Sequence, residues 1–214
     1  MDVVTGNLSG FVHAGWVTIE LSVVSYIGAF VIGIVVAAFR VSPVPPLRAA
    51  GALYVDVIRN IPLAVHFVLF FFAFPKIGIT FSPLTSAFIV LAVYHGSFAG
   101  EIIRAGINTV ARGQAEAARA LGFTFPAVLG RVVLPQALRS VVPPLGSLLI
   151  ALIKNTSVAY TIAVVELTGF ADKLGNETAR PFPAFLGAGA AYLILTLPTA
   201  FVVRRLERKL AVVR

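Results

Sequence analysis

The chain has 214 residues, of which 58% are hydrophobic and only 12% are charged. Soluble domains average about 45–50% apolar and about 25% charged residues, so the composition excludes a soluble domain and indicates a single-domain integral membrane protein. The formal net charge of +8 is better explained by basic loops on one side of a membrane than by a nucleic-acid partner. Cysteine is absent, which excludes a disulfide framework, a thiol nucleophile and a cysteine-ligated metal site.

Five apolar runs are long enough to cross a bilayer, because about 20 helical residues span a hydrocarbon core of about 30 Å. They predict an all-α integral membrane fold in one transmembrane domain, residues 1–214, with helices at residues 17–39, 49–74, 84–107, 141–165 and 184–203. We expect no signal peptide, since the first basic residue, Arg40, follows the first apolar run.

The basic residues indicate how these helices are oriented. One group of loops holds most of them, namely Arg40, Arg48, Arg112, Arg119, Arg131, Arg139, Arg204, Arg205, Arg208, Lys209 and Arg214, whereas the opposite loops hold Lys76, Lys173 and Arg180. Because cytoplasmic loops collect Lys and Arg, we expect the N-terminus outside and the C-terminus in the cytoplasm. The same rule places residues 113–135 in the cytoplasm.

Residues 113–135 form the one long segment that a membrane would reject. Its pattern predicts two short helices, residues 114–121 and 125–133, separated at Gly122, since glycine readily takes the left-handed cap conformation. Ala117, Ala118 and Leu121 follow helical spacing and predict a small, smooth face, with Glu116 and Arg119 beside it to fix an orientation.

The spacing of this segment resembles the EAA loop of ABC-importer permeases. The matching positions are Glu116, Ala117, Ala118, Gly122, Val132, Leu134 and Pro135, with Val132 where the family often has Ile. The resemblance implies a coupling helix that docks into a cleft on an ATP-hydrolysing subunit, with Glu116, Ala117, Ala118, Arg119, Leu121 and Gly122 as the coupling residues. The plainer interpretation is a cytoplasmic loop that happens to be helical.

The likeness extends over residues 18–206 and points to the polar amino-acid branch of these permeases. RNIPL, AGINTV, KNTS and the tail LTLP…LERKLAV look most like a glutamate-uptake permease. This implies the type I importer permease fold, in a bacterial cytoplasmic (inner) membrane complex of two permeases, two ATPases and an extracytoplasmic substrate-binding protein. ATP and Mg would be bound by the ATPase, and this non-catalytic chain would hold no cofactor or metal.

Charged residues inside the predicted spans are costly in lipid and usually face protein or water. Asp56 and Arg59 are three residues apart, so they either form an internal ion pair or line a gate or pocket on the transport path. Glu101 and Arg104 have the same spacing, and we expect that pair to pack the end of the third span beside the cytoplasmic segment.

The run Lys154, Asn155, Thr156 and Ser157 lies near the middle of the fourth span. It either packs against another helix or binds an amino acid in transit, because a cation and hydrogen-bond donors suit a carboxylate. Many relatives in the resembling family carry Asp where this chain has Asn155, so we hypothesise that Asn155 favours an acidic or neutral substrate.

Other polar and small residues have packing interpretations. We expect His66 and His95 to form hydrogen bonds between helices, and Gly96 and Gly100 to mark either close helix packing or the face toward a partner chain. Residues 166–180 are polar and predict a solvated turn, which could also dock a substrate-delivery protein.

Together these features predict the permease subunit of an importer for a polar amino acid, glutamate or glutamine. A secondary amino-acid transporter is the alternative, although the chain offers few mid-membrane carboxylates for ion coupling. A membrane enzyme ranks last, since the three histidines lack metal-ligand spacing and no nucleophile–base pair is evident. No GxxxxGK[ST] run is present, so ATP hydrolysis would need a separate subunit.

Overall fold

The computed structural model describes residues 2–210, and secondary structure in that range is entirely helical, which confirms the all-α prediction. Arg214, one of the basic residues used for orientation, lies outside the described residues. The elements in chain order are α1 (Asp2–Thr5), α2 (Leu8–Val41), α3 (Pro45–Asn60), α4 (Leu63–Ala73), η1 (Phe74–Ile77), α5 (Pro83–Asn108), α6 (Arg112–Ala120), α7 (Phe125–Val128), η2 (Leu129–Val133), α8 (Leu134–Asn155), η3 (Thr156–Ile162), α9 (Leu167–Thr178) and α10 (Pro181–Leu210).

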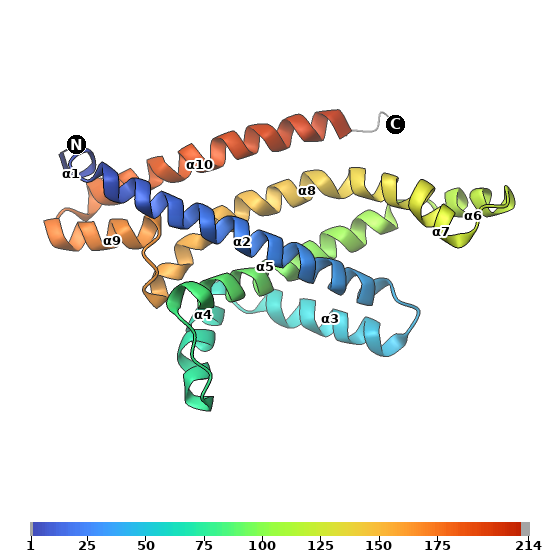
Figure 1. The fold of residues 1–214 in the computed structure, drawn as a ribbon, viewed down its shortest axis with the longest axis horizontal. Coiled ribbons are helices and arrows are strands. Elements are labelled where there is room, and N and C mark those ends of the chain that lie inside the picture. The colour runs from blue at the N-terminus through green and yellow to red at the C-terminus, as the bar shows by residue number, and fades with distance from the viewer. Residues whose placement is uncertain (1, 211–214) are drawn as a thin grey trace.

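Among the described residues, four helical stretches are long and apolar enough to cross a membrane: α2, α5, α8 continued by η3, and α10. The bent pair α3 and α4 makes a fifth if it counts as one span. The long helices lie roughly along one axis of the molecule (Figure 1). The chain is therefore built as a multi-pass membrane protein.

Helices α2 and α5 pack most closely, and glycines make this possible. A Cβ atom placed on Gly96 would lie 2.7 Å from a methyl carbon of Ile32, and one on Gly100 would lie 2.7 Å from a methyl carbon of Val36. Neither space admits a side chain, so the two backbones approach each other directly. The predicted packing role of Gly96 and Gly100 is confirmed.

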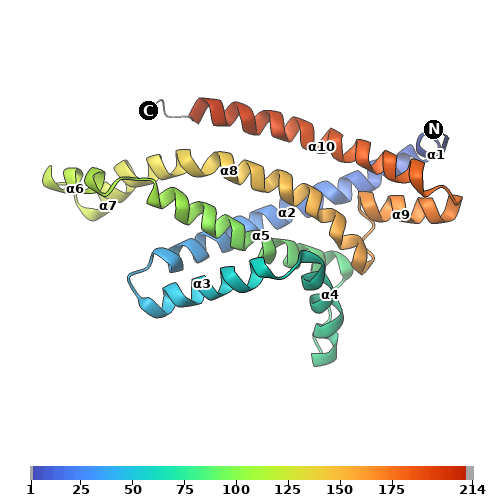
Figure 2. The ribbon, with the colours of Figure 1, turned by 180° about the vertical axis from the view of Figure 1, so that it is seen from behind.

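The predicted span over residues 49–74 is not one continuous helix. It breaks between α3 and α4 with a bend of 100°, and α4 leaves the bundle sideways (Figure 2). Proline removes a backbone donor and restricts the residue before it, and Ile61, which precedes Pro62, is extended with φ −98° and ψ 131°. The helix therefore ends at Asn60 and restarts at Leu63.

The two ends of the molecule carry different elements. The α2–α3 turn, the α6–α7 segment and the end of α10 lie at one end, whereas α1 and α9 lie at the other (Figure 1). The segments that carry the larger group of basic residues are thus gathered at the same end. Which side of the membrane this end faces stays a prediction.

The predicted solvated turn over residues 166–180 is also wrong, because most of it forms α9. The buried Glu166 carboxylate caps this helix, accepting hydrogen bonds from the backbone N–H groups of Thr168 (3.0 Å) and Gly169 (2.8 Å). The Tyr192 hydroxyl on α10 donates a third bond at 2.5 Å. The pKa of the Glu166 carboxyl lies above its ordinary value, because the effect of burial outweighs the opposite effect of these hydrogen bonds. The cap fixes α9 to α10.

Candidate functional site

Residues 112–133, here called the docking segment, protrude at the end of the molecule that also holds the C-terminal part of α10 (Figure 1). The segment consists of α6, the short α7 and the π-helical turn η2, which leads directly into α8. These bounds lie close to the two helices predicted from the sequence. Helix α6 is therefore connected to α8 through α7 and η2.

Gly122 ends α6 in the left-handed conformation that the sequence predicts, with φ +83°. The N–H of Phe123 donates to the carbonyl of Ala118 (3.1 Å), and the N–H of Gly122 donates to the carbonyl of Arg119 (2.9 Å). This pair of bonds is a Schellman motif, which reverses the chain while satisfying carbonyls at the helix end. A side chain at this φ would strain the turn.

The predicted face of α6 needs one correction. Ala118 is buried (7% exposed), whereas Leu121 is 80% exposed and Ala117 is exposed as well. Ala117 and Leu121 are four residues apart and share a face, while Ala118 lies about 100° around the helix and points inward. The outer surface thus presents Ala117 and Leu121, with the exposed Glu116 and Arg119 beside them.

Asn155 joins α8 to α5 through His95. The Asn155 side-chain amide lies 3.1 Å from Nε2 of His95, and Nδ1 of His95 lies 2.9 Å from the carbonyl of Leu91. When the Asn155 amide donates to Nε2, the ring proton sits on Nδ1, which then donates to the Leu91 carbonyl. His95 is thus a partner between helices, as predicted.

Arg59 does not pair with Asp56 in the structure, so of the two alternatives for these residues the internal ion pair is wrong, whereas a role on the transport path stays a prediction. Its guanidinium lies instead over the Phe98 ring of α5, 4.6 Å from the centroid. The Asp56 carbonyl accepts a bond from the Asn60 side chain (2.6 Å), and its carboxylate forms no ion pair with residues 2–210. A planar guanidinium stacks well on an aromatic face, which α5 offers beside α3.

These contacts meet on one stretch of α5. The Phe98 ring, which carries Arg59, lies 5.2 Å from the Tyr94 ring and 6.5 Å from the His95 ring, measured between centroids. We call Arg59, Tyr94, His95, Phe98 and Asn155 the polar cluster. Sequence reasoning missed Tyr94 and Phe98. The only signal for them was that each aromatic residue is next to a polar residue in the sequence, Tyr94 before His95 and Phe98 after Ser97.

His66 borders the polar cluster without the hydrogen bond between helices that was predicted for it. Its Nδ1 lies 3.2 Å from the Pro62 carbonyl in its own helix, and its ring meets Tyr94 edge to face at 5.7 Å. Its Nε2 is buried and has no hydrogen-bond partner among the described residues. The contact of His66 with α5 is therefore aromatic.

The remaining residues of the Lys154–Ser157 run lie where α8 tightens into η3. The buried Thr156 hydroxyl donates to the Ile153 carbonyl (2.7 Å), and Ser157 is half-buried. Lys154 is exposed and forms no ion pair within residues 2–210. Arg59 of α3 and Asn155 of α8 thus contact neighbouring residues of α5, Phe98 and His95. Lys154 and Asp56 do not belong to this cluster.

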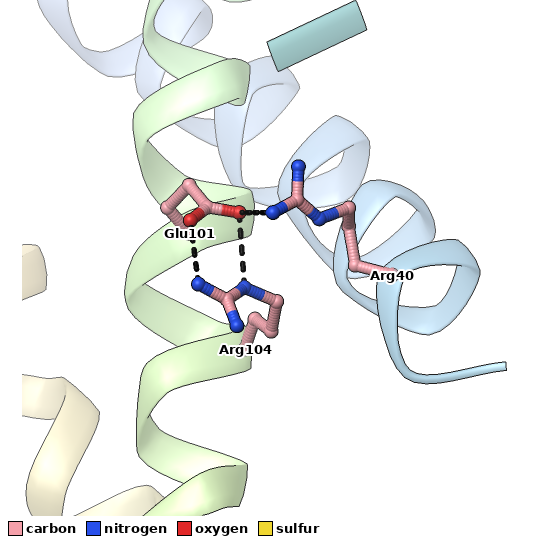
Figure 3. A network of polar contacts seen from close by, with 3 residues as sticks. All are labelled: Arg40, Glu101 and Arg104. Atoms are coloured by element: carbon pink, nitrogen blue, oxygen red, sulfur yellow. Dashed lines mark hydrogen bonds and ion pairs between the residues drawn. The ribbon is translucent and has the colours of Figure 1, made fainter. Parts of the chain in front are cut away.

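Near the docking segment, Glu101 and Arg104 pair as predicted. Arg104 donates two hydrogen bonds to the Glu101 carboxylate (3.1 and 2.8 Å), and Arg40 at the end of α2 approaches it at 3.4 Å (Figure 3). Sequence reasoning did not identify Arg40 as a partner of Glu101, although Arg40 directly follows the first apolar run. The carboxylate ties the ends of α2 and α5 together.

No group of three His, Asp or Glu side chains within residues 2–210 is placed to hold a metal ion. The geometry of the chain is therefore that of helices joined by polar contacts, with one exposed helical segment at the end.

Known proteins resemble this chain over nearly its whole length. The model of the family "Binding-protein-dependent transport system inner membrane component" matches residues 29–212. The probable glutamine ABC transporter permease protein GlnM of Bacillus subtilis (strain 168) is 35% identical over 98% of this chain and 97% of its own. The glutamate transport system permease protein GluC of Corynebacterium glutamicum is 40% identical over 93% of each chain. A solved amino acid ABC transporter, crystallised with histidines, superimposes with a TM-score of 0.91 at 29% identity, covering 96% of both chains.

Proposed function

The chain belongs to the family of binding-protein-dependent transport system inner membrane components, and we propose that it forms the membrane path of an ATP-driven importer for a polar amino acid. Glutamate and glutamine are the favoured substrates, because similar permeases are named for them. In this proposal the chain is not catalytic, and a separate ATPase binds ATP and Mg. The N-terminus lies outside a bacterial cytoplasmic membrane and the C-terminus lies in the cytoplasm.

The docking segment is the observation that carries this proposal. It protrudes beyond the long helices, and Glu116, Ala117 and Arg119 on α6 are exposed, as is Leu121 directly after it. An 80%-exposed leucine beside an alanine and two charges suits insertion into a cleft of another protein. Ala118 is buried on the inner side of α6 and packs it in place, and Gly122 reverses the chain at its end. We assign the ATPase contact to this surface.

The connection from the docking segment to the polar cluster supports a mechanism. Helix α8 begins next to the turn η2 and ends at Asn155, which bonds to His95 of α5. A movement of α6 would shift α8 along or about its axis and strain or release that hydrogen bond. ATP binding can drive the change only by favouring one helix arrangement over another, and the docking segment transmits that difference.

Exposed charges within the helical bundle support a second permease chain. Asp56, Arg59 and Lys154 are exposed in the single chain, and charged side chains facing lipid are costly. A second copy, or a related chain, would enclose them around an aqueous path. Arg59 and Lys154 would then attract the carboxylate of the substrate, with Asn155, Thr156 and Ser157 as hydrogen-bonding neighbours.

The end opposite the docking segment carries α9, which is fixed by Glu166 and still exposes Lys173 and Glu177. We assign contact with an extracytoplasmic substrate-binding protein to this end.

The docking role is tested by replacing Gly122 with Asp in the assembled transporter. The left-handed backbone there disfavours any side chain, so we expect transport to fall by about 5- to 150-fold, which corresponds to a loss of roughly 1–3 kcal/mol at the strained position. Membrane insertion should be unchanged. Gly113→Asp is the matched control, because Gly113 lies in the same segment with open space around it and no positive φ. Equal uptake by both variants would refute the docking role.

The substrate role of Asn155 is tested by Asn155→Asp, which places a negative charge at this position. We expect glutamate uptake to fall relative to arginine uptake, since a new carboxylate repels an acid and attracts a cation. Unchanged relative rates would rule out a selective role. Uptake driven by an ion gradient without any ATPase would instead support a secondary transporter.

A further inference from the structure

The last helix ends in a basic face that the proposed transport cycle does not use. Phe201, Arg204, Arg205 and Arg208 line a hollow on α10 and follow the spacing i, i+3, i+4 and i+7, so they share one face. Val203 packs toward α8, where a Cβ placed on Gly146 would lie 2.6 Å from one of its methyl carbons. The basic face lies about 150° around the helix from Val203, at about 100° per residue. It therefore points away from the bundle.

The guanidinium groups on this face are exposed and form no ion pair with residues 2–210. Arg205 lies over the Phe201 ring, 4.4 Å from its centroid, and Nε of Arg204 lies 3.4 Å from the Ala200 carbonyl. Glu207 is three residues after Arg204, but among residues 2–210 it forms no ion pair with any of these arginines. The hollow thus concentrates unpaired positive charge beside an aromatic ring.

The same face of α10 is apolar along the rest of its length. Leu186, Ile194 and Leu197 are 58%, 71% and 56% exposed, and they fall on the same side of the helix as Phe201. The 19 steps from Leu186 to Arg205 span about 29 Å, which matches a hydrocarbon core of about 30 Å. When the apolar stripe crosses the bilayer, the arginines reach the level of the lipid phosphates.

We propose that this face binds an anionic phospholipid, with one acyl chain along Ile194 and Leu197 and the headgroup phosphate between Arg204, Arg205 and Arg208. A guanidinium group can donate two parallel hydrogen bonds to the oxygens of one phosphate. Aromatic side chains are common at the membrane–water interface, where the lipid phosphates lie. A free phosphate would leave the apolar stripe uncovered. A second copy of this chain packed about a two-fold axis on this face would bring two sets of unpaired arginines together, which like-charge repulsion opposes.

The site is tested on the full-length chain in zwitterionic detergent by native mass spectrometry. The probes are dioleoylphosphatidylglycerol, dioleoylphosphatidylcholine and inorganic phosphate as a competitor. We expect the phosphatidylglycerol to bind tightly and R204Q/R205Q/R208Q to weaken it on the order of 100-fold, at about five-fold per basic residue. The control R48Q/R131Q/R139Q removes three exposed charges from the same end and should weaken it less than about three-fold.

Several results would overturn the site. Equal weakening in both triple variants would mean that only net charge matters, and displacement of the lipid by inorganic phosphate at the same concentration would mean that the acyl chain contributes nothing.

The chain has no cysteine, so Leu197→Cys offers a single cross-linking position on the stripe. Efficient disulfide cross-linking between copies in lipid bilayers would show that another chain covers this face. The variant with Lys at all three positions should keep most of the binding, which separates loss of charge from loss of fold. None of these measurements depends on transport.

Discussion

Glycine serves two regions of this molecule for different reasons. At the α2–α5 interface, Gly96 and Gly100 leave room that Ile32 and Val36 of the same chain fill. In the docking segment, a Cβ on Gly122 would meet nothing within 4 Å, and the residue is needed for its positive φ instead. The first region is complete within the chain, whereas the second shapes a surface for another protein. Damage to the first should unfold the protein, and damage to the second should uncouple it.

The largest expected effect is that of Gly100→Val on stability. The new side chain would overlap Val36, and overpacking costs about 1–3 kcal/mol or prevents folding altogether. Thermal unfolding in detergent measures this. Gly189→Val is the control on α10, where a Cβ meets open space, and it should change the free energy of unfolding by less than about 0.5 kcal/mol. Similar unfolding temperatures for both variants would contradict the claim that the space at Gly100 is needed for α2 and α5 to pack.

Leu121→Gln should act on the other side of the comparison. The side chain is 80% exposed, so the free energy of unfolding should change by less than about 0.5 kcal/mol. Loss of a leucine that becomes buried against the ATPase should cost about 1.5–3 kcal/mol, which weakens ATPase binding at least about ten-fold. Titration of the purified ATPase onto the permease measures that affinity.

Leu138→Gln is the matched control, because Leu138 is 56% exposed on α8 outside the docking segment. An equal loss of ATPase affinity in this variant would mean that the contact surface is not centred on α6.

The smallest effect concerns the ion pairs that close the end of the α2–α5 interface. Glu101→Gln removes the charge that Arg40 and Arg104 share (Figure 3), and we expect the free energy of unfolding to fall by about 1–2 kcal/mol. Glu177→Gln breaks a pair whose partners are 62% and 61% exposed, and it should change stability by less than about 0.5 kcal/mol. Denaturant unfolding of both variants makes the comparison, and equal changes would mean that burial adds nothing to the Glu101 pairs.

Several features of the fold were predictable because their signals are local. The left-handed turn at Gly122 follows from glycine at the end of a short helix, and the pairing of Glu101 with Arg104 follows from their spacing. The bend between α3 and α4 had a visible cause in Pro62, but an apolar run on both sides concealed it. Burial of Glu166 could not be foreseen, because its partner Tyr192 is distant in sequence.

The polar cluster was only half predictable. The sequence placed Arg59 and Asn155 inside spans, and for Arg59 it offered the Asp56 carboxylate, three residues away, as one possible partner. The rotation of α3 against α5 decided instead that Phe98 lies under its guanidinium. Likewise, α6 could be placed by its pattern, while the packing of η2 and α7 decided that Ala118 points inward.

By itself, the sequence determined that the chain is helical, lies in a membrane and carries one polar helical segment ending at Gly122. These properties depend on residues within a few turns of one another, where composition, spacing and backbone preference suffice. Only the tertiary structure decided that Arg40 reaches Glu101, that His95 accepts from Asn155 and that the arginines of α10 face outward. Those outcomes depend on how the helices are rotated and how far each slides against its neighbour, which is set by the packing of all of them together.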